Sequence, residues 1–328
     1  MGKVARMIGD GLVCVQCIDI IHFLQGITTN DCATLERRGA RPQYSALLNS
    51  QGRFLYDMHL HRTREEKRVL LADVDKQSVP DLIKLLRRYK LRANVDVADV
   101  SDEHAVWVRF GADAEGVLQP DCWPPDARYS TLGQRKLLPR GDDSCLLQDD
   151  PVADPAAYQQ WRFEHGIAEG AEIPAGSAVP LEYNLDGLRG ISFTKGCYVG
   201  QELIARAHFR GVVRKRLMPL ALAPGADAAA LSPGADVHAR GAVRPVGRMA
   251  LVAPPRALAV LRLQPALAAA AAALGLQKEA YSGGEPAPEL HIGGTGDGPI
   301  VVPRRPEWWP ATWGHEDTGD AAAQAAAG

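Results

Sequence analysis

The chain has 328 residues, which is enough for two or three packed units with hydrophobic cores of their own. Hydrophobic residues make up 46% of it and charged residues 23%, and the formal net charge is −2. This composition is typical of a globular protein and shows no basic excess that would indicate nucleic-acid binding. The Ala-rich run at 263–276 lies between Pro and Gly and is too short for a bilayer, so no membrane span is expected.

The cysteines are spaced irregularly, which argues against a disulfide framework and favours a reducing compartment. They stand at Cys14, Cys17, Cys32, Cys122, Cys145 and Cys197. The first two form a single C-x-x-C, but no second Cys pair or His pair has zinc spacing, so a metal site there is not favoured. The N-terminal stretch lacks both a secretory pattern and the length of a transit peptide. Either the protein works where it is made or a presequence has been removed.

The first hundred residues predict strands and helices in a mixed order. Residues 21–35 indicate the start of a helix with apolar side chains on one face. Residues 43–62 predict a β-hairpin around the turn N-S-Q-G, and residues 68–75 predict a third strand. Residues 78–100 contain an amphipathic helix from about Asp81 to Tyr89, followed by another strand. This order of elements indicates an α+β sandwich.

The middle of the chain predicts loops and one capped helix. Residues 111–155 are rich in Gly, Pro and Asp, and short strands are expected near 104–110 and 144–147. The helix at 154–166 should begin with Asp154 as N-cap and Pro155 at its first position, and end at Gly166.

The C-terminal third predicts a small β-barrel and a tail. Residues 212–222 alternate like a strand, and short segments separated by Gly and Pro continue to about residue 262. From Pro303 onward the periodicity of a core element is absent, so residues 303–328 are predicted to be largely disordered. The W-W-P-A-T-W within this tail is interpreted as an inert end rather than as a peptide that docks on a partner.

The residues with the clearest chemical potential lie in the run I-S-F-T-K-G-C-Y-V-G-Q-E-L-I-A-R at 191–206. A helix beginning near Gly200 and the positive charge of Lys195 would both favour the thiolate form of Cys197. The glycines at 196 and 200 permit a tight turn and a close approach of the backbone to another group. From these residues alone, a buried structural cysteine stays an alternative, because free cysteines are among the most buried residues.

The octapeptide K-G-C-Y-V-G-Q-E resembles the signature of the YgfZ-type folate-binding proteins, a branch of the family that includes the aminomethyltransferase of the glycine cleavage system. Further blocks follow in that family's order: F-L-Q-G-I-T-T-N-D, L-L-N-S-Q-G-R-F-L-Y-D, W-R-F-E-H-G-I-A-E-G and R-G-V-V-R-K-R-L. The likeness covers roughly residues 20–250. This version of the blocks is most similar to the mitochondrial members that help to mature iron–sulfur proteins.

The resemblance implies an α+β fold: a three-domain cloverleaf of the aminomethyltransferase (GcvT-like) type with a small C-terminal β-barrel. It divides the chain into a folate-cleft domain (1–48 with 152–205), an α+β domain (49–151), a barrel domain (206–302) and the tail. It also implies a monomer in the mitochondrial matrix, although no clear presequence stands in this chain.

The resemblance also implies the site residues. The signature consists of Lys195, Gly196, Cys197, Tyr198, Gly200, Gln201 and Glu202. Cys197 is its one redox-capable side chain, where the aminomethyltransferases carry an aspartate. Asp57 matches the region of their catalytic aspartate, and Arg162, Glu164 and Glu182 match blocks that line the folate cleft. A carboxylate such as Glu182 can accept paired N–H bonds from a pterin.

Simpler interpretations remain open for several of these residues. Asp57 is interpreted as a surface acid beside a turn in preference to a catalytic residue, because its neighbours alternate like an ordinary strand. His59 and His61 are interpreted as exposed polar positions and not as ligands. The basic run either meets the glutamyl tail of a folate or is a solvated strand face; it comprises Arg206, Arg210, Arg214, Lys215 and Arg216.

The function implied is that of a tetrahydrofolate-binding protein required for the maturation of [4Fe-4S] proteins, with A-type iron–sulfur scaffold proteins and ferredoxin as partners. Cys197 would contact a shared cluster transiently or carry out thiol chemistry beside the folate. No stable cluster is expected on this chain alone, because a cluster takes about four thiolates. One alternative is a folate-dependent one-carbon (aminomethyl-type) transferase with Asp57 as its acid, and another is an interaction scaffold that has lost the ligand. The sequence leaves open whether any reaction is catalysed.

Overall fold

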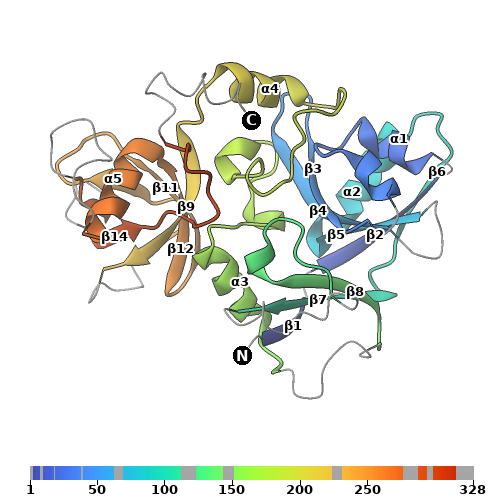
Figure 1. The fold of residues 1–328 in the computed structure, drawn as a ribbon, viewed down its shortest axis with the longest axis horizontal. Helices are drawn as coiled ribbons and strands as arrows, with labels where there is room; N and C mark the ends of the chain where they lie inside the picture. Colours follow the sequence, from blue (N-terminus) through green and yellow to red (C-terminus); the bar gives the residue numbers. More distant parts are fainter. Residues whose placement is uncertain are drawn as a thin grey trace. The chain divides into compact units, whose positions relative to one another are not determined.

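The computed structural model describes residues 3–7, 10–17, 19–37, 40–62, 69–111, 123–142, 151–223, 231–275, 287–293 and 298–314. The contacts within the chain divide it into two compact units (Figure 1). The first unit comprises Met1–Trp161, Ala168–Pro180 and Leu185–Ala205, and the second comprises Arg162–Ile167, Leu181–Asn184 and Arg206–Gly328. In the part of the chain that is described, no helix has the length and apolar character needed to cross a membrane.

A five-stranded sheet in the order β3-β4-β5-β2-β6 forms the larger core of the first unit, and all of its neighbouring strands are antiparallel (Figure 1). Its strands are β2 (Asp10–Cys17), β3 (Gln43–Leu48), β4 (Phe54–Arg62), β5 (Val69–Asp75) and β6 (Val95–Asp99). The predicted hairpin, the third strand and the strand that follows the helix are therefore confirmed.

Two helices bury their apolar side chains on this sheet. The helix α2 (Val79–Tyr89) buries Val79, Leu82 and Leu86, and it carries an acid in its first turn and arginines in its last turn, as the helix dipole favours. This helix was predicted correctly. The helix predicted from residue 21 is the single short helix α1 (Ile20–Gln25), because Gly26 ends it. A 3₁₀ turn at Cys32–Glu36 follows.

A second, three-stranded sheet of the first unit has the order β1-β7-β8, with strands at β1 (Lys3–Met7), β7 (His104–Phe110) and β8 (Gln134–Pro139). The helix α3 (Pro155–Glu164) packs Tyr158 against Val108 and Phe110 of β7. The side chain of Asp154 accepts the N–H of Ala156 at 2.8 Å, which confirms the predicted N-cap. The strand β8 lies in a stretch predicted as loop, and the strand expected at 144–147 falls outside the described residues.

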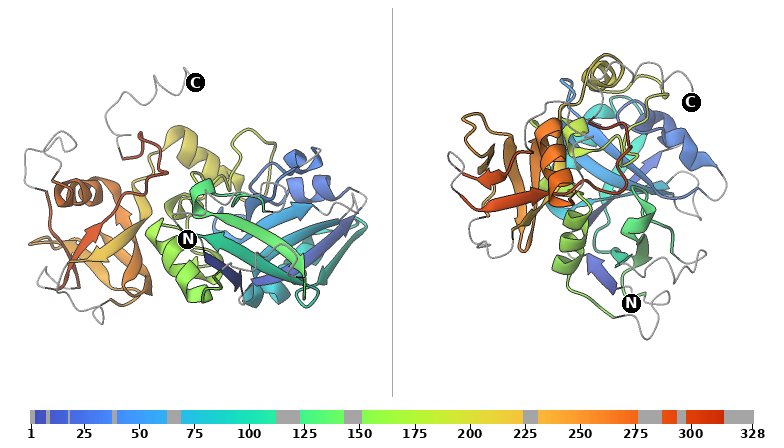
Figure 2. Two further views of the ribbon diagram at one scale, coloured as in Figure 1. Left: turned by 60° about the horizontal axis from the view of Figure 1, so that its bottom comes forward. Right: turned by 60° about the vertical axis from the view of Figure 1, so that its left-hand side comes forward.

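The second unit contains the predicted barrel, closed in the order β10-β11-β12-β9-β14-β13 (Figure 2). Its strands are β9 (Lys215–Leu222), β10 (Asp236–Ala239), β11 (Gly247–Ala253), β12 (Arg256–Arg262), β13 (Leu290–Ile292) and β14 (Ile300–Pro303). The helix α5 (Leu263–Ala273) packs its buried alanines into the same core.

Residues 303–314 contradict the prediction of a disordered tail. Trp309 and Trp313 are buried in the core of the barrel unit, with ring centroids 5.3 Å apart. The guanidinium of Arg216 on β9 lies 3.2 Å from the ring centroid of Trp313 and donates to the carbonyl of Leu181. Tryptophans are too large to bury without excluding much water, so this segment belongs to the barrel. Residues 315–328 lie outside the described residues.

Candidate functional site

The signature loop precedes the helix α4 (Gln201–Arg210), so the helix start predicted near Gly200 is confirmed. Cys197 stands before that helix and is exposed to solvent. The flanking Tyr198 is buried, and its backbone carbonyl accepts the N–H of Gln201 at 3.2 Å. Cys197 therefore presents its thiol outward from a loop whose next residue is anchored in the protein.

The two glycines of the signature have different roles. Gly200 has φ of 81°, and a side-chain carbon there would meet the carbonyl oxygen of Asn49 at 2.4 Å. The turn between β3 and β4 contains Gly52, whose φ is 75°. A side-chain carbon at Gly52 would meet Leu203 of α4 at 2.6 Å. A side-chain carbon at Gly196 would meet nothing within 4 Å. The predicted close approach is thus made by Gly200, which seats the loop against the turn between β3 and β4.

The side chain of Lys195 extends toward the loop after α1. Its ammonium donates to the carbonyl oxygens of Thr28 and Asn30 at 2.7 and 2.8 Å, and it lies 5.1 Å from the ring centroid of Tyr198. Burial lowers the pKa of Lys195, which the nearby Cys32 and Asp31 oppose. The side chain of Lys195 therefore joins the signature loop before α4 to the loop after α1.

The other described cysteines are unsuited to ligation from the surface. Cys32 is fully buried with its sulfur 3.2 Å from the hydroxyl of Thr28, and burial raises the pKa of its thiol. Cys14 and Cys17 are separated by three positions on the strand β2, so they point to opposite faces, and Cys17 joins the core of the large sheet. The C-x-x-C is therefore structural. Cys122 and Cys145 lie outside the described residues.

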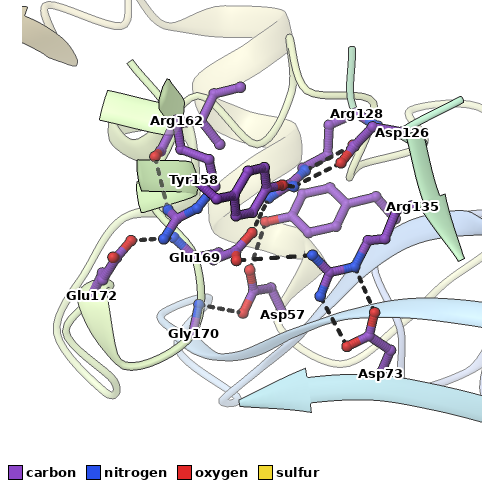
Figure 3. A network of polar contacts seen from close by, with 12 residues as sticks. Asp57, Asp73, Asp126, Arg128, Arg135, Tyr158, Arg162, Glu169, Gly170 and Glu172 are labelled. Atoms are coloured by element: carbon purple, nitrogen blue, oxygen red, sulfur yellow. Dashed lines mark hydrogen bonds and ion pairs between the residues drawn. The ribbon is translucent and has the colours of Figure 1, made fainter. Parts of the chain in front are cut away.

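A buried polar network surrounds Asp57 on β4 (Figure 3). The carboxylate is 5% exposed, and it accepts the Tyr44 hydroxyl at 2.9 Å and the backbone N–H of Gly170 at 3.0 Å. Burial, with the nearby charge of Glu169, raises the pKa of Asp57 to about 6. The interpretation of Asp57 as a surface acid is wrong, because the unit folds a second layer of residues over this part of the strand.

Two buried arginines balance the acids of this network (Figure 3). Arg128 donates to both oxygens of Asp126, at 2.9 and 2.8 Å, and to Glu169 at 2.5 Å. It also donates to the hydroxyl of Tyr158 on α3 at 3.0 Å. These fork-shaped contacts fix the planar guanidinium in one orientation.

A second fork joins the two sheets of the first unit. Arg135 on β8 donates to the two oxygens of Asp73 on β5 at 2.6 and 3.0 Å. Burial alone would raise the pKa of Asp73, but the facing guanidinium holds it well below the usual range.

The histidines of β4 also differ from the prediction. His59 is buried with its ring 5.1 Å from that of Tyr44, and burial, aided by the charge of Arg135, lowers its pKa to about 3. His61 is partly buried, with Nε2 3.8 Å from the carboxylate of Asp73. Both residues therefore belong to the interior of the network instead of an exposed face.

The other predicted folate contacts belong to the second unit. Arg162 is buried and donates to the carbonyl of Ile167 at 3.1 Å, and Glu164 forms an ion pair with Arg256 at 3.1 Å. Glu182 is partly buried in the 3₁₀ turn Pro180–Tyr183. The structure thus divides the predicted folate residues between the units, and their joint role stays a prediction.

In the basic run of the second unit and α4, Arg216 alone is buried; Arg206, Arg210, Arg214 and Lys215 are exposed. The interpretation as a solvated face fits these four side chains. Sequence reasoning missed the other members of the polar network that surrounds Asp57, namely Asp73, Asp126, Arg128, Arg135, Tyr158 and Glu169. One signal was available, since the aspartate at 73 interrupts the apolar run L-L-A-D-V and a strand rarely buries such a residue without a partner.

Comparison with known proteins finds one matching family model and several similar proteins. Residues 214–311 match the family of the CAF17 C-terminal β-barrel domain. The chain is 34% identical over 236 residues to the mitochondrial iron–sulfur cluster assembly factor IBA57 homolog of Mycosarcoma maydis, with 67% of this chain and 57% of that protein covered. It is 36% identical to the mitochondrial IBA57 proteins of Mus musculus and Homo sapiens, covering 66% of this chain and 65% of each of them. The chain thus spans between half and two thirds of the length of these relatives.

Among solved structures, the glycine cleavage system aminomethyltransferase T of Bartonella henselae superposes with a TM-score of 0.66. The superposition covers 94% of this chain and 86% of that one at 15% identity, which shows the fold alone. The predicted α+β fold of aminomethyltransferase type with a C-terminal barrel is therefore confirmed. The names of the relatives confirm the predicted mitochondrial location, while the matrix stays a prediction. Over about two thirds of its length the chain is therefore similar to proteins named as IBA57 iron–sulfur cluster assembly factors, and it has the aminomethyltransferase fold with a barrel that matches the CAF17 type.

Proposed function

We propose that this protein is a mitochondrial assembly factor for iron–sulfur proteins, acting in the maturation of [4Fe-4S] enzymes. The observation that carries the proposal is the signature K-G-C-Y-V-G-Q-E in a homologue of IBA57, where the described structure leaves the thiol of Cys197 exposed. A thiol that serves a partner must be reachable, and the loop around it must hold its shape. Tyr198, Gly200 and Lys195 supply that shape through the contacts described above.

In this function the cluster is cargo and Cys197 contacts it transiently while a partner provides the other ligands. A thiolate is the form that binds iron, and one such group supplies a fraction of the roughly four ligands that a cluster needs. A-type scaffold proteins and ferredoxin are the partners we propose for donation and reduction. Thiol chemistry beside a folate is the other role that the exposed position of Cys197 permits.

Tetrahydrofolate is the ligand that we propose for this fold. When bound, it would supply a reduced pterin that carries one-carbon units or electrons. Partly buried carboxylates such as Glu182 suit the N–H groups of a pterin, which favours the proposal. Arg162 and Glu164 already hold protein partners, so they would shape the walls of a folate site.

A one-carbon transferase is the second candidate function. It is favoured by the pKa of Asp57, about 6, because a general acid or base works best when its pKa lies near the ambient pH. However, each oxygen of that carboxylate already accepts a hydrogen bond from Tyr44 or Gly170. The residue is also 5% exposed, so a ligand could exchange a proton with it only by entering a buried network, which favours assembly over catalysis.

The decisive experiment is complementation of mitochondria that lack the native protein. The wild-type chain should restore the activity of [4Fe-4S] enzymes, and Cys197→Ser should not, while [2Fe-2S] enzymes stay unaffected in both. Cys14→Ser is the matched control, because it removes a thiol from β2 and should restore activity fully. Full rescue by a folded Cys197→Ser chain would overturn the role given to this thiol.

Folate binding and transferase activity are tested separately. Calorimetry with tetrahydrofolate should show a saturable site that Glu182→Ala weakens, and the ligand should raise the melting temperature of the protein. Incubation with folate and an aminomethyl donor tests the second candidate. Turnover that Asp57→Asn abolishes would favour the transferase.

A further inference from the structure

The last turns of α4 and the segment that follows them present basic side chains to solvent. Arg206 and Arg210 stand four positions apart, on one face of the helix, and Arg214 and Lys215 follow at the entry to β9. All four side chains are exposed, and in the described part of the chain none of them forms an ion pair. Residues 206–215 contain no acid, although the chain as a whole has a net charge of −2. The positive charge is therefore a local feature of this segment.

Apolar side chains stand among these cations. Phe209 is 66% exposed, and the ring of His208 lies edge to face against it with ring centroids 4.8 Å apart. Val212 is 38% exposed. One exposed apolar residue is ordinary on a protein surface, but an aromatic ring surrounded by arginines is the composition that protein interfaces favour. Burial of Phe209 against a partner would remove apolar area from water, which is favourable.

A hollow of about 230 Å³ continues this surface within the second unit. Its apolar walls are Val212 and Val213, with Leu263 and Pro265 from the start of α5. Arg214 also lines it, and no acid stands among its lining residues, all of which are described. The backbone N–H of Leu263 donates to the carbonyl of Arg214 at 2.9 Å, which holds the two walls together. The hollow can admit an apolar side chain of a partner, as interface pockets do.

The chain itself limits the distance between this surface and the functional thiol. The helix α4 begins four positions after Cys197, and four residues of chain span at most about 14 Å. The eight helical residues from Gln201 to Phe209 cover about 12 Å, so the Cα atoms of Cys197 and Phe209 are at most about 26 Å apart. A standard protein interface covers about 800 Å² on each partner, a patch about 30 Å across. One partner can therefore contact both residues.

We propose that this α4 surface, formed by Arg206, Phe209, Arg210, Val212 and the hollow beside Arg214, docks the acidic face of the protein that carries the cluster to Cys197. The arginines steer a partner of opposite charge toward the surface, and Phe209 and the hollow supply the apolar contacts that retain it. The proposal rests on the function proposed above, which supplies the identity of the partner. A second copy of this chain would bring like charges together, and a flat lipid surface would leave the hollow unfilled.

Binding measurements on the full chain test the surface. The probes are an A-type scaffold protein and a ferredoxin, each with and without its cluster. Phe209→Ser should weaken binding at least about tenfold, the scale of a central aromatic residue. Arg210→Glu should weaken it about threefold to tenfold at low salt, mainly through slower association, and less at high salt. Both variants should act on the loaded and the cluster-free partner alike, whereas Cys197→Ser should weaken binding of the loaded partner only.

Two matched controls lie in the first unit. Leu91→Ser removes an apolar side chain that is 86% exposed, and Arg88→Glu reverses an exposed charge on α2. Both should bind the partners as the wild type does. Thermal denaturation should show all four variants to be as stable as the wild type, because substitutions of exposed residues change stability little. If Phe209→Ser were unstable, Arg210→Glu would still test the surface.

The outcomes separate the surface from the function. Binding that Phe209→Ser and Arg210→Glu weaken, with both controls unchanged, supports the α4 surface. Binding that ignores both variants overturns the surface and leaves the proposed function intact. No binding of either partner overturns the surface, as does binding through Phe209 and Arg210 to vesicles of phosphatidylcholine and cardiolipin alone. Docking with a wild-type chain that fails to restore [4Fe-4S] enzymes supports the surface and overturns the function.

Discussion

The five-stranded sheet of the first unit and the barrel of the second bury their polar groups in different ways. The first unit encloses a network of hydrogen bonds and ion pairs, in which Asp57, Asp73 and Arg135 are nearly inaccessible to water. The barrel encloses apolar side chains and stacks the buried Arg216 on a tryptophan. Removing charge from water costs free energy that good pairing offsets only in part. The stability of the first unit should therefore depend on protonation, and that of the second on packing.

The largest effect is expected from Trp309→Ala in the barrel. The substitution leaves a cavity among Trp313, Met218 and the other residues of that core, and losses of this kind cost about 3–5 kcal/mol. Urea denaturation followed by circular dichroism should show the loss. Glu307→Ala, two positions away and exposed, is the control and should stay within about 0.5 kcal/mol of the wild type. Equal stability of the two variants would contradict the packing of the segment at 303–314.

The next effect concerns the fork between the sheets of the first unit. Arg135→Gln leaves the carboxylate of Asp73 buried without its guanidinium, which should cost about 3 kcal/mol near neutral pH. Arg135→Met combined with Asp73→Asn removes both charges, and this double variant should recover part of the loss. A double variant less stable than the single one would show that the pair itself stabilises the unit, contrary to this argument.

Protonation should act on the first unit through two opposing groups. The pKa of Asp57 rises on folding from 3.8 to about 6, so its contribution to stability is lost as the pH rises through 6. The pKa of His59 falls from 6.5 to about 3, so its contribution is lost as the pH falls below 6.5. Between about pH 4 and pH 6 the two contributions cancel in the wild type.

Single substitutions should uncover each contribution. Relative to the wild type, Asp57→Asn should gain stability with rising pH between pH 4 and pH 6, by about 1.4 kcal/mol per pH unit. His59→Gln should lose stability over the same range with the opposite slope. Thermal denaturation of the three proteins across this range measures the two difference curves. Parallel curves for all three would mean that neither group changes its pKa on folding.

The sequence predicts those elements whose signals are local. The hairpin at 43–62 follows from alternation around a turn with Gly52, and α3 follows from a capping aspartate before a proline. The strand β8 was not predicted, because Gly133 and the neighbouring prolines are typical of loops. The residues of β7 that pair with it lie about 30 positions earlier in the chain. Tertiary contacts decide that strand.

The candidate site shows the same limit. The signature at 195–202 can be recognised in the sequence because its residues are contiguous. The exposure of Cys197 agrees with a functional thiol in this signature. The burial of Asp57 and His59 could not be predicted from the sequence, because alternating polar positions on a strand normally face water. In the structure, Arg128 and Glu169 come from distant segments of the chain and lie near them. Likewise, the direction of Lys195 depends on Thr28 and Asn30, which no local pattern connects to it.

Within the signature itself, Lys195→Met should cost about 2 kcal/mol. The variant keeps the volume of the side chain but leaves the carbonyl oxygens of Thr28 and Asn30 without the ammonium that they now accept. Chemical denaturation measures the loss, and hydrogen exchange should show faster opening of the loop after α1. An unchanged exchange rate in that loop would show that the lysine does not hold it.

The smallest effect on stability belongs to the residue with the largest proposed role. Cys197→Ser changes one exposed atom, so the free energy of unfolding should stay within about 0.5 kcal/mol of the wild type.

In the wild type, an alkylating probe near neutral pH should modify Cys197 well before Cys17 and Cys32, because those two thiols are shielded in the core. Peptide mapping of the modified sites checks the order. If Cys17 or Cys32 reacted first, the loop would not present the thiol as described. If Cys197→Ser unfolded the protein, its loss of function would report packing and not chemistry. A stable, folded serine variant that fails to support [4Fe-4S] enzymes isolates the sulfur atom as the functional group.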